Sequence, residues 1–212
     1  MDEFFEQSIL NRLQVTAKAL GRNHMEAHVV SNRAKLLNAI RLMVPKGSVV
    51  CSGGSMTLEE VGITQMLKDE DYDYYFRGRV DEAGNPIDVL RKAYTADWYF
   101  SGSNAITLAG ELYNVDGNAN RISAITFGPK NVVIVAGYNK VVKDLAEAEE
   151  RVKAIAAPAN CVRLNIDNGC RTAGHCVNCH SDTRICCTTA IHRFQRETNR
   201  IKIFLLPEVL GY

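Results

Sequence analysis

The sequence lacks the features that mark a membrane span, a secretory signal or a nucleic-acid partner. No apolar run approaches the ~18 residues that suggest a membrane span. The opening MDEFFEQSIL is acidic and contains no basic segment followed by an apolar run, so it does not match a secretory signal. The formal net charge is only +1, too small to attract nucleic acid or anionic lipid. We therefore expect a cytoplasmic protein without a nucleic-acid partner.

The usual cofactor and nucleotide fingerprints are missing as well. The one glycine turn that follows a predicted strand is not followed by the Gly-Lys-Ser/Thr of a Walker A loop, and it does not match G-x-G-x-x-G. No flavin or nicotinamide fingerprint is present, so hydride chemistry would belong to a partner. Repeats and low-complexity linkers are also lacking. With 46% hydrophobic and 23% charged residues, the chain is expected to form one globular domain over residues 1–212.

Hydrophobic periodicity predicts strands that alternate with helices. We expect strands at 26–30, 48–52, 97–102, 131–137 and 200–207, and an N-terminal helix that carries Phe5, Ile9, Leu13 and Ala17. Ser31 is expected to cap the second helix. Residues 131–137 (NVVIVAG) are typical of a strand buried on both faces. The pattern favours an α/β fold with a mostly parallel sheet covered on both faces.

The segment after residue 140 predicts the clearest helix. Its expected apolar stripe consists of Val141, Leu145, Ala148, Val152 and Ile155. Glu147–Arg151 and Glu149–Lys153 have the spacing of ion pairs on its solvent face. Pro158 is expected to end it.

The glycine turn in SVVCSGGSMTLEEVG (residues 48–62) is a candidate anion site. Thr57 and Glu60 have capping-box spacing, which places a helix start near Leu58. The backbone amides of Gly53, Gly54 and Ser55 would then meet the positive end of that helix. The alternative is a tight turn that needs only the backbone freedom of glycine.

A polar stretch, SGSNAITLAGELYNVDGNANR, occupies residues 101–121. A hairpin over 105–115 with a polar tip is one interpretation. The functional interpretation places Asn104, Asp116, Asn118 and Arg121 beside the glycine turn, because open α/β sheets bind ligands at the carboxyl ends of their strands. Arg121 would then offer a fork for a carboxylate or phosphate.

Five of the seven cysteines fall within residues 170–187, which we call the cysteine segment. Cys170, Cys176, Cys179 and Cys186 have the spacing C-x5-C-x2-C-x6-C. Four thiolates could hold zinc or an iron–sulfur cluster, although common ferredoxin spacings differ. Disulfides are unexpected in the cytoplasm. A metal-free loop is the alternative, with Cys51 and Cys161 as small buried residues.

Four stretches in order resemble the LUD domain, the lactate-utilisation family. They are GGSMTLEEVG (53–62), NAITLAGELYNVDGNANR (104–121), FGPKNVVIVAGYNKVV (127–142) and CRTAGHCVNCHSDTRIC (170–186). The resemblance implies a three-layer α/β/α sandwich like the sugar-phosphate isomerases and CoA-transferases. It also implies ligand-binding roles for Gly53, Gly54, Ser55, Thr57, Asn104, Asp116, Asn118, Arg121, Asn139 and Lys140. The family pattern often has asparagine at position 187, which sets Cys187 apart from the other thiols.

Three functions follow as hypotheses. The resemblance implies an accessory component of bacterial L-lactate oxidation to pyruvate that acts with iron–sulfur partner proteins. The alternative is a small-molecule enzyme of isomerase or CoA-transferase type that binds an anion at the glycine turn, with Glu111 as base or nucleophile. The third hypothesis is a regulatory protein whose cysteines sense redox state.

Overall fold

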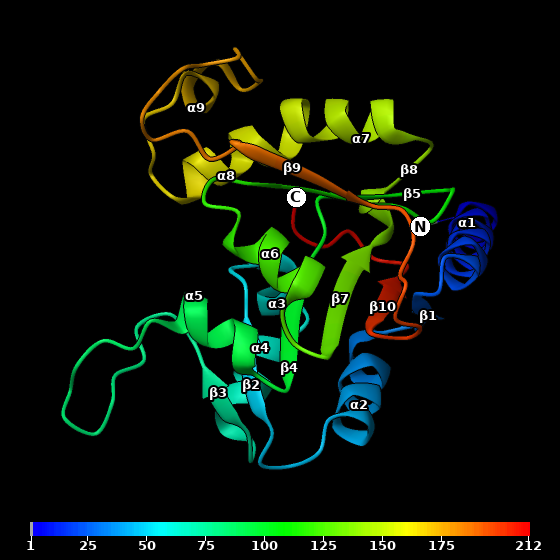
Figure 1. The fold of residues 1–212 in the computed structure, drawn as a ribbon. Helices are drawn as coiled ribbons and strands as arrows, with labels where there is room; N and C mark the ends of the chain where they lie inside the picture. The colour runs from blue at the N-terminus through cyan, green and yellow to red at the C-terminus, as the bar shows by residue number, and fades with distance from the viewer. Residues whose placement is uncertain (1) are drawn as a thin grey trace.

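A computed structural model describes residues 2–212 and shows the predicted three-layer α/β/α arrangement around a parallel sheet (Figure 1). The main sheet has the strand order β1-β10-β7-β4-β2-β3, and every neighbouring pair is parallel. Its strands are β1 (Glu26–Val29), β2 (Val49–Ser52), β3 (Asp73–Tyr75), β4 (Trp98–Gly102), β7 (Asn131–Gly137) and β10 (Ile201–Leu206). All five strands predicted from the sequence are in this sheet.

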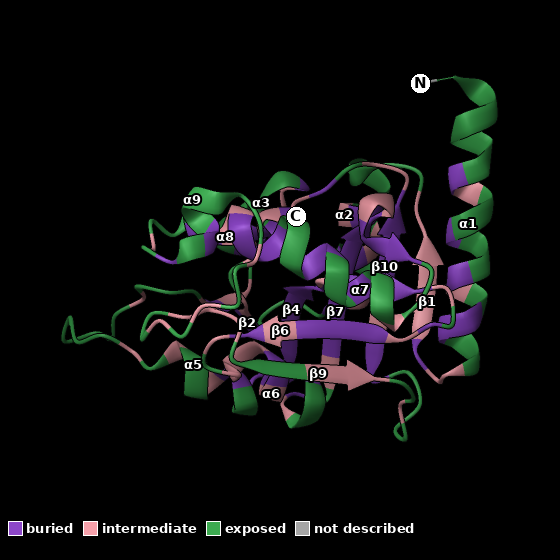
Figure 2. Ribbon diagram, turned by 90° about the horizontal axis from the view of Figure 1, so that it is seen from above, coloured by how far each residue is buried: buried purple, intermediate pink, exposed green. Residues whose placement is uncertain are grey.

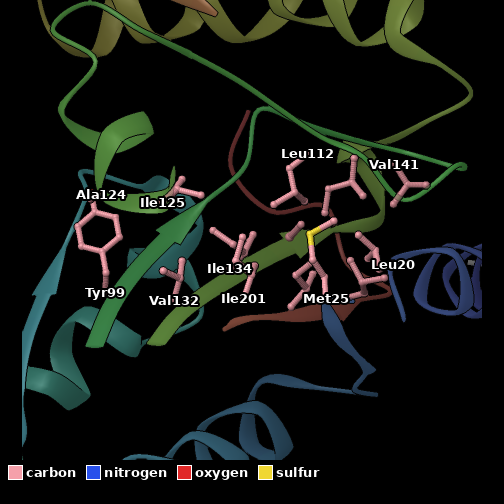
Figure 3. Close-up of a cluster of buried hydrophobic side chains, with 14 of the residues drawn as sticks. Leu20, Met25, Tyr99, Leu112, Ala124, Ile125, Val132, Ile134, Val141 and Ile201 are labelled. Carbon is pink, nitrogen blue, oxygen red and sulfur yellow. The ribbon is translucent and has the colours of Figure 1, made fainter. Parts of the chain in front are cut away.

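Alternate residues of the central strands enter two different cores. On β7, Val133 and Val135 face the cluster formed with α2 (Arg33–Met43), α3 (Met56–Glu60) and α4 (Ile63–Asp69). The intervening Ile134 belongs to the cluster that includes α1 (Glu3–Arg22) and α6 (Asn120–Phe127), part of which Figure 3 shows. Figure 2 shows the buried central strands between exposed outer helix faces. Burial on both faces explains the unbroken apolar run of β7.

A second, smaller sheet lies beside the first and was predicted only in part. It has the order β8-β5-β6-β9, with β8 (Val141–Val142), β5 (Ala105–Thr107), β6 (Leu112–Asp116) and β9 (Thr188–His192). The predicted hairpin over 105–115 is the antiparallel pair β5–β6. The sequence did not indicate β8, which has two residues, or β9, whose Thr-Thr-Ala-Ile-His is largely polar.

Two predicted helix starts are wrong by one and two residues. Asn32, rather than Ser31, caps α2, and its side chain accepts a hydrogen bond from the amide of Lys35 at 2.9 Å. Ser55 caps α3, which begins at Met56 instead of near Leu58. Both capping residues are of types preferred at helix N-termini. The sequence therefore predicted the kind of cap correctly but not its position.

The helix after residue 140 also differs from its prediction. Val141 lies in β8, and α7 spans Leu145–Arg151. A π-helical turn (Val152–Ala156) joins it to α8 (Ala157–Arg163), so Pro158 falls in the first turn of a helix, where its missing N–H is tolerated, and does not end the helical run. Glu149 pairs with Lys153 as expected, at 2.7 Å.

Arg151, expected on the solvent face, is buried, and Ile155, expected in the apolar stripe, is partly exposed. Arg151 does not pair with Glu147 but is buried, donating to the carbonyl oxygens of Asn139 and Asn104. Ile155 is half exposed.

The remaining α-helices are α5 (Val89–Lys92) and α9 (Gly169–Ala173), which opens the cysteine segment. No helix within residues 2–212 is long and apolar enough to cross a bilayer.

Gly110 fixes the β5–β6 turn against α1, and a matched pair of substitutions tests this. Gly110 and Gly84 both have positive φ, 81° and 83°. A Cβ on Gly110 would lie 2.6 Å from the backbone of Ala19, whereas one on Gly84 would meet nothing within 4 Å. We expect Gly84→Ala to cost about 1–2 kcal/mol of unfolding free energy through φ strain alone. Gly110→Ala should cost clearly more in urea unfolding, and equal costs would contradict the close packing.

Candidate functional site

A cavity of ≈ 730 Å³ opens where β2, β4 and β7 end, and we call it the main cavity. The glycine turn (Gly53, Gly54 and Ser55) reaches it from β2, Gly102 and Asn104 from β4, and Lys140 from the turn after β7. Asp116, Asn118 and Arg121 reach it from the end of β6 and the start of α6. The predicted juxtaposition of the glycine turn with the polar stretch is therefore present in the structure.

Gly53 is a glycine because two side chains crowd its backbone. A Cβ at this position would lie 2.9 Å from the hydroxyl of Tyr99 and 3.4 Å from Cδ of Arg121. Gly54 has open space instead. The helix that follows the turn, α3, has only five residues, so its dipole offers less to an anion than a long helix would. Side chains must supply most of the positive charge.

Arg121 is held in place by protein acceptors at every one of its donors. Nε donates to Asp116, whose carboxylate also lies 2.7 Å from Nη2. Nη1 donates to Asn114 Oδ1 and the carbonyl oxygen of Gly102, and Nη2 donates to Asn104 Oδ1 and the carbonyl oxygen of Val115. The guanidinium was expected to bind an anion. Because its donors are already bonded to protein acceptors, Arg121 instead positions the cavity wall.

Lys140 is the buried cation of the main cavity. Its side chain is 4% exposed, and its one hydrogen bond within residues 2–212 goes to Oγ1 of Thr57 at 2.9 Å. Burial, with the nearby charges of Arg151 and Arg121, lowers the pKa of the lysine to about 7. A lysine ammonium has three donors, so two remain available to a bound acceptor.

Glycines leave room around the Lys140 amine. A Cβ on Gly102 would lie 3.0 Å from Ser55 Oγ and 3.7 Å from Nζ of Lys140. A Cβ on Gly211 would lie 3.4 Å from the same Nζ. The sequence did not single out Gly102, although its place at the end of β4 matches the place of Gly53 after β2.

Thr57 and Asn139 stand behind the cavity wall instead of lining it. Thr57 is buried and accepts the Lys140 hydrogen bond. Asn139 binds the backbone of the C-terminal segment, accepting from the amide of Leu210 at 3.1 Å and donating to the carbonyl oxygen of Gly211 at 3.2 Å. Both therefore position the residues that line the cavity.

Glu111 does not line the main cavity. It sits at the β5–β6 turn, at the opposite end of β6 from Asp116. Its carboxylate accepts from Oγ1 of Thr107 at 3.1 Å and pairs with Arg193 at 3.1 Å. Because a five-residue strand separates it from the cavity end of β6, Glu111 is not placed to act as a base on a ligand bound there.

The lining of the main cavity is basic overall. Its basic side chains are Lys68, Arg77, Arg121, Lys140, Arg163 and Arg184, and its acidic ones are Glu59, Asp116 and Asp182. Since Asp116 is paired with Arg121, the remaining cations exceed the remaining carboxylates. This balance favours an anion.

The thiols of the cysteine segment do not gather around one point, as the predicted ligand set would require. Cys170 is buried, and its sulfur lies 3.4 Å from the sulfur of Cys161, a residue that is not in the predicted ligand set. Burial raises the pKa of the Cys170 thiol, and its contact with Cys161 raises it further. Cys176 and Cys186 line a second cavity of ≈ 550 Å³. Within residues 2–212, no group of three or more His, Cys, Asp or Glu side chains is arranged to hold a metal ion.

The four sulfurs of Cys170, Cys176, Cys179 and Cys186 therefore do not fit one metal centre in this conformation. Cys186 Sγ accepts from Nε of Arg184 at 3.3 Å. The neighbouring Cys187 donates to the carbonyl oxygen of Arg184 at 3.3 Å.

Comparisons with known proteins identify a family and solved structures with a similar fold, of which two are described here. The sequence profile of the LUD domain family matches residues 13–206. No curated protein matches the chain. A DUF162 family protein from Deinococcus radiodurans is 14% identical with a TM-score of 0.49, covering 95% of this chain and 98% of its own. The eIF2B delta structure from Chaetomium thermophilum is 17% identical with a TM-score of 0.37, covering 69% of this chain and 55% of its own.

The buried amine predicts a pH-dependent stability. The folded protein holds Lys140 at a pKa of about 7, below the ordinary 10.5 of the unfolded chain. The unfolded state therefore binds the extra proton between those values, and stability rises with pH across that window. The unfolding free energy of wild type relative to Lys140→Met should rise by on the order of 3–5 kcal/mol over it. Urea unfolding along a pH series measures this, and a constant difference would contradict the burial of the amine.

The iron–sulfur and zinc alternatives remain predictions from the sequence. If Cys170, Cys176, Cys179 and Cys186 form a centre, anaerobically reconstituted Cys176→Ser should lose its metal because it lacks one of four thiolate ligands. Cys187→Ser, the matched control, should keep it. Metal analysis distinguishes the cases, and equal metal content in both variants or none in wild type would reject the four-cysteine centre.

Proposed function

The chain belongs to the LUD domain family, which associates it with lactate utilisation, and from that premise we propose that it binds a small carboxylate or phosphate anion in the main cavity. We propose further that it does so as an accessory component of L-lactate oxidation. The observation that carries the proposal is the buried, under-bonded ammonium of Lys140 beside the glycine turn.

The chemistry of Lys140 supports an anionic ligand. Burying an ammonium group without a carboxylate is unfavourable, and burial together with the nearby Arg151 and Arg121 charges lowers the pKa of Lys140. An anion placed against Nζ would supply the missing charge and accept the two unused donors. Ligand binding would thereby raise the pKa of the amine and restore its charged form.

The surroundings of Lys140 support a ligand that approaches the backbone closely. Gly102 and Gly211 leave space on two sides of Nζ. The side chain of Ser55 and the amides of the glycine turn add neutral polar groups to the same wall. Amides and hydroxyls suit both carboxylate and phosphate oxygens, so the probes must separate the two.

The accessory role assigns the redox chemistry to other proteins. Oxidation of lactate to pyruvate removes two electrons, and we propose that iron–sulfur partner proteins accept them. The chain would contribute recognition of the small anion. Support for this part comes from the family association alone.

The anion proposal is tested by calorimetric titration of inorganic phosphate, L-lactate and pyruvate below pH 7, where Lys140 is charged. Wild type should bind at least one of the three. Lys140→Met should weaken that binding roughly 10- to 100-fold, because a hydrogen bond to a charged group contributes about 1.5–3 kcal/mol. Affinity should also fall in wild type as the pH rises above 7, and this fall should be absent in the variant.

Lys202→Met is the matched control. Lys202 is a partly buried lysine whose pKa is lowered by burial, but it lies on β10 and binds Asn199 and Asn131 outside the main cavity. Its replacement should leave anion affinity unchanged. Equal affinity in wild type and Lys140→Met would refute the role of the amine, and no binding of any probe would refute the proposal.

A further inference from the structure

We propose that the ligand of the main cavity is an anion that carries an aromatic ring system, of the class of a nucleoside monophosphate, with its ring against Phe76. The inference rests on the proposed function, because it places the phosphate at Lys140. It adds a second subsite, formed by side chains that the sequence did not single out.

The size of the main cavity calls for more than a three-carbon acid. Its ≈ 730 Å³ falls within the roughly 300–1,000 Å³ of sites that enclose whole small-molecule ligands. A carboxylate or phosphate at Lys140 would occupy one end only. The other end is lined by Tyr74, Phe76, Val89 and Leu90, from the end of β3 and the start of α5.

Phe76 presents an aromatic surface at this end. Its ring centroid is 5.6 Å from that of Tyr74, with the planes tilted by 44°. The side-chain amine of Lys68 lies 5.3 Å from its centroid. Phe76 is nevertheless 36% exposed, so a ring that covered it would bury apolar surface that now faces solvent.

The two ends of the main cavity are connected through Tyr74. Its hydroxyl shares a 2.6 Å hydrogen bond with Ser52, the residue just before the glycine turn. Ser52, Tyr74, Phe76 and Glu59 all line this one cavity. A ligand could therefore span from the glycine turn to Phe76 without leaving the cavity.

The composition of the aromatic end favours a planar ring over an alkyl chain. Aromatic side chains and the planar guanidinium of arginine are the groups that stack on nucleobases, and Arg77 accompanies Phe76 here. Glu59 supplies an acceptor for an exocyclic amino group. An alkyl chain would use neither the guanidinium nor the carboxylate.

The experiment compares adenosine monophosphate with inorganic phosphate by calorimetry on the full chain. Wild type should bind the nucleotide roughly tenfold or more tightly than phosphate, as expected for one base stacked on an aromatic side chain. Phe76→Ala should abolish that advantage and leave phosphate affinity unchanged, which also shows that the variant is folded. Phe76→Trp should retain the advantage. Phe127→Ala, which alters an 86% exposed phenylalanine outside the main cavity, should behave as wild type.

Three outcomes would overturn the inference. The first is a nucleotide that binds no more tightly than phosphate, which leaves the anion proposal standing. The second is an unchanged nucleotide advantage in Phe76→Ala. The third is hexyl phosphate that binds wild type more tightly than the nucleotide, which would assign the aromatic end to an alkyl chain. If neither phosphate nor nucleotide binds, the inference fails, and the proposed function fails with it only if L-lactate and pyruvate do not bind either.

Discussion

The guanidinium of Arg121 joins the two sheets at the edge where the main cavity forms. It binds the carbonyl oxygen of Gly102 at the end of β4 and three consecutive residues of β6, Asn114, Val115 and Asp116. The paired carboxylate is itself buried, so loss of either partner would strand a charge out of water. The crowding at Gly53 is a consequence of the same side chain. The position of the cavity wall thus depends on one saturated arginine.

That arginine is one of three buried cations at the main cavity: Arg121 and Lys140 line it, and Arg151 binds the carbonyl oxygen of Asn139 next to Lys140. Arg151 is buried against backbone carbonyls only, and burial lowers its pKa to about 10. Among residues 2–212, the amine of Lys140 has a single hydrogen-bond partner, the hydroxyl of Thr57. Asp116 neutralises one of the three charges, and the unmatched positive charge falls on Lys140, whose amine can lose its proton where a guanidinium cannot. The main cavity therefore has an excess of buried positive charge, which the proposed anion would balance.

The main sheet was predictable because its signals are local. β7 and β10 are buried on both faces and therefore have unbroken apolar sequences. The placement of Arg121 beside the glycine turn followed from the rule that open α/β sheets bind ligands at the carboxyl ends of their strands, whereas Lys140 was indicated only by the family resemblance. By contrast, β9 pairs with β6 across more than seventy residues and has a polar sequence, so only tertiary contacts define it. The Cys161–Cys170 contact depends on the packing of α8 against α9, which spacing alone does not encode.

The cysteine segment repeats on a smaller scale what Arg121 does for the sheets. Arg184 donates to the carbonyl oxygens of Cys179 and Cys186 and to the sulfur of Cys186, so one guanidinium closes the loop between the two residues. The same side chain lines both the main cavity and the smaller one that contains Cys176. The cysteine segment therefore lies against the wall of the candidate site, and the side chain that binds Cys186 also lines the main cavity.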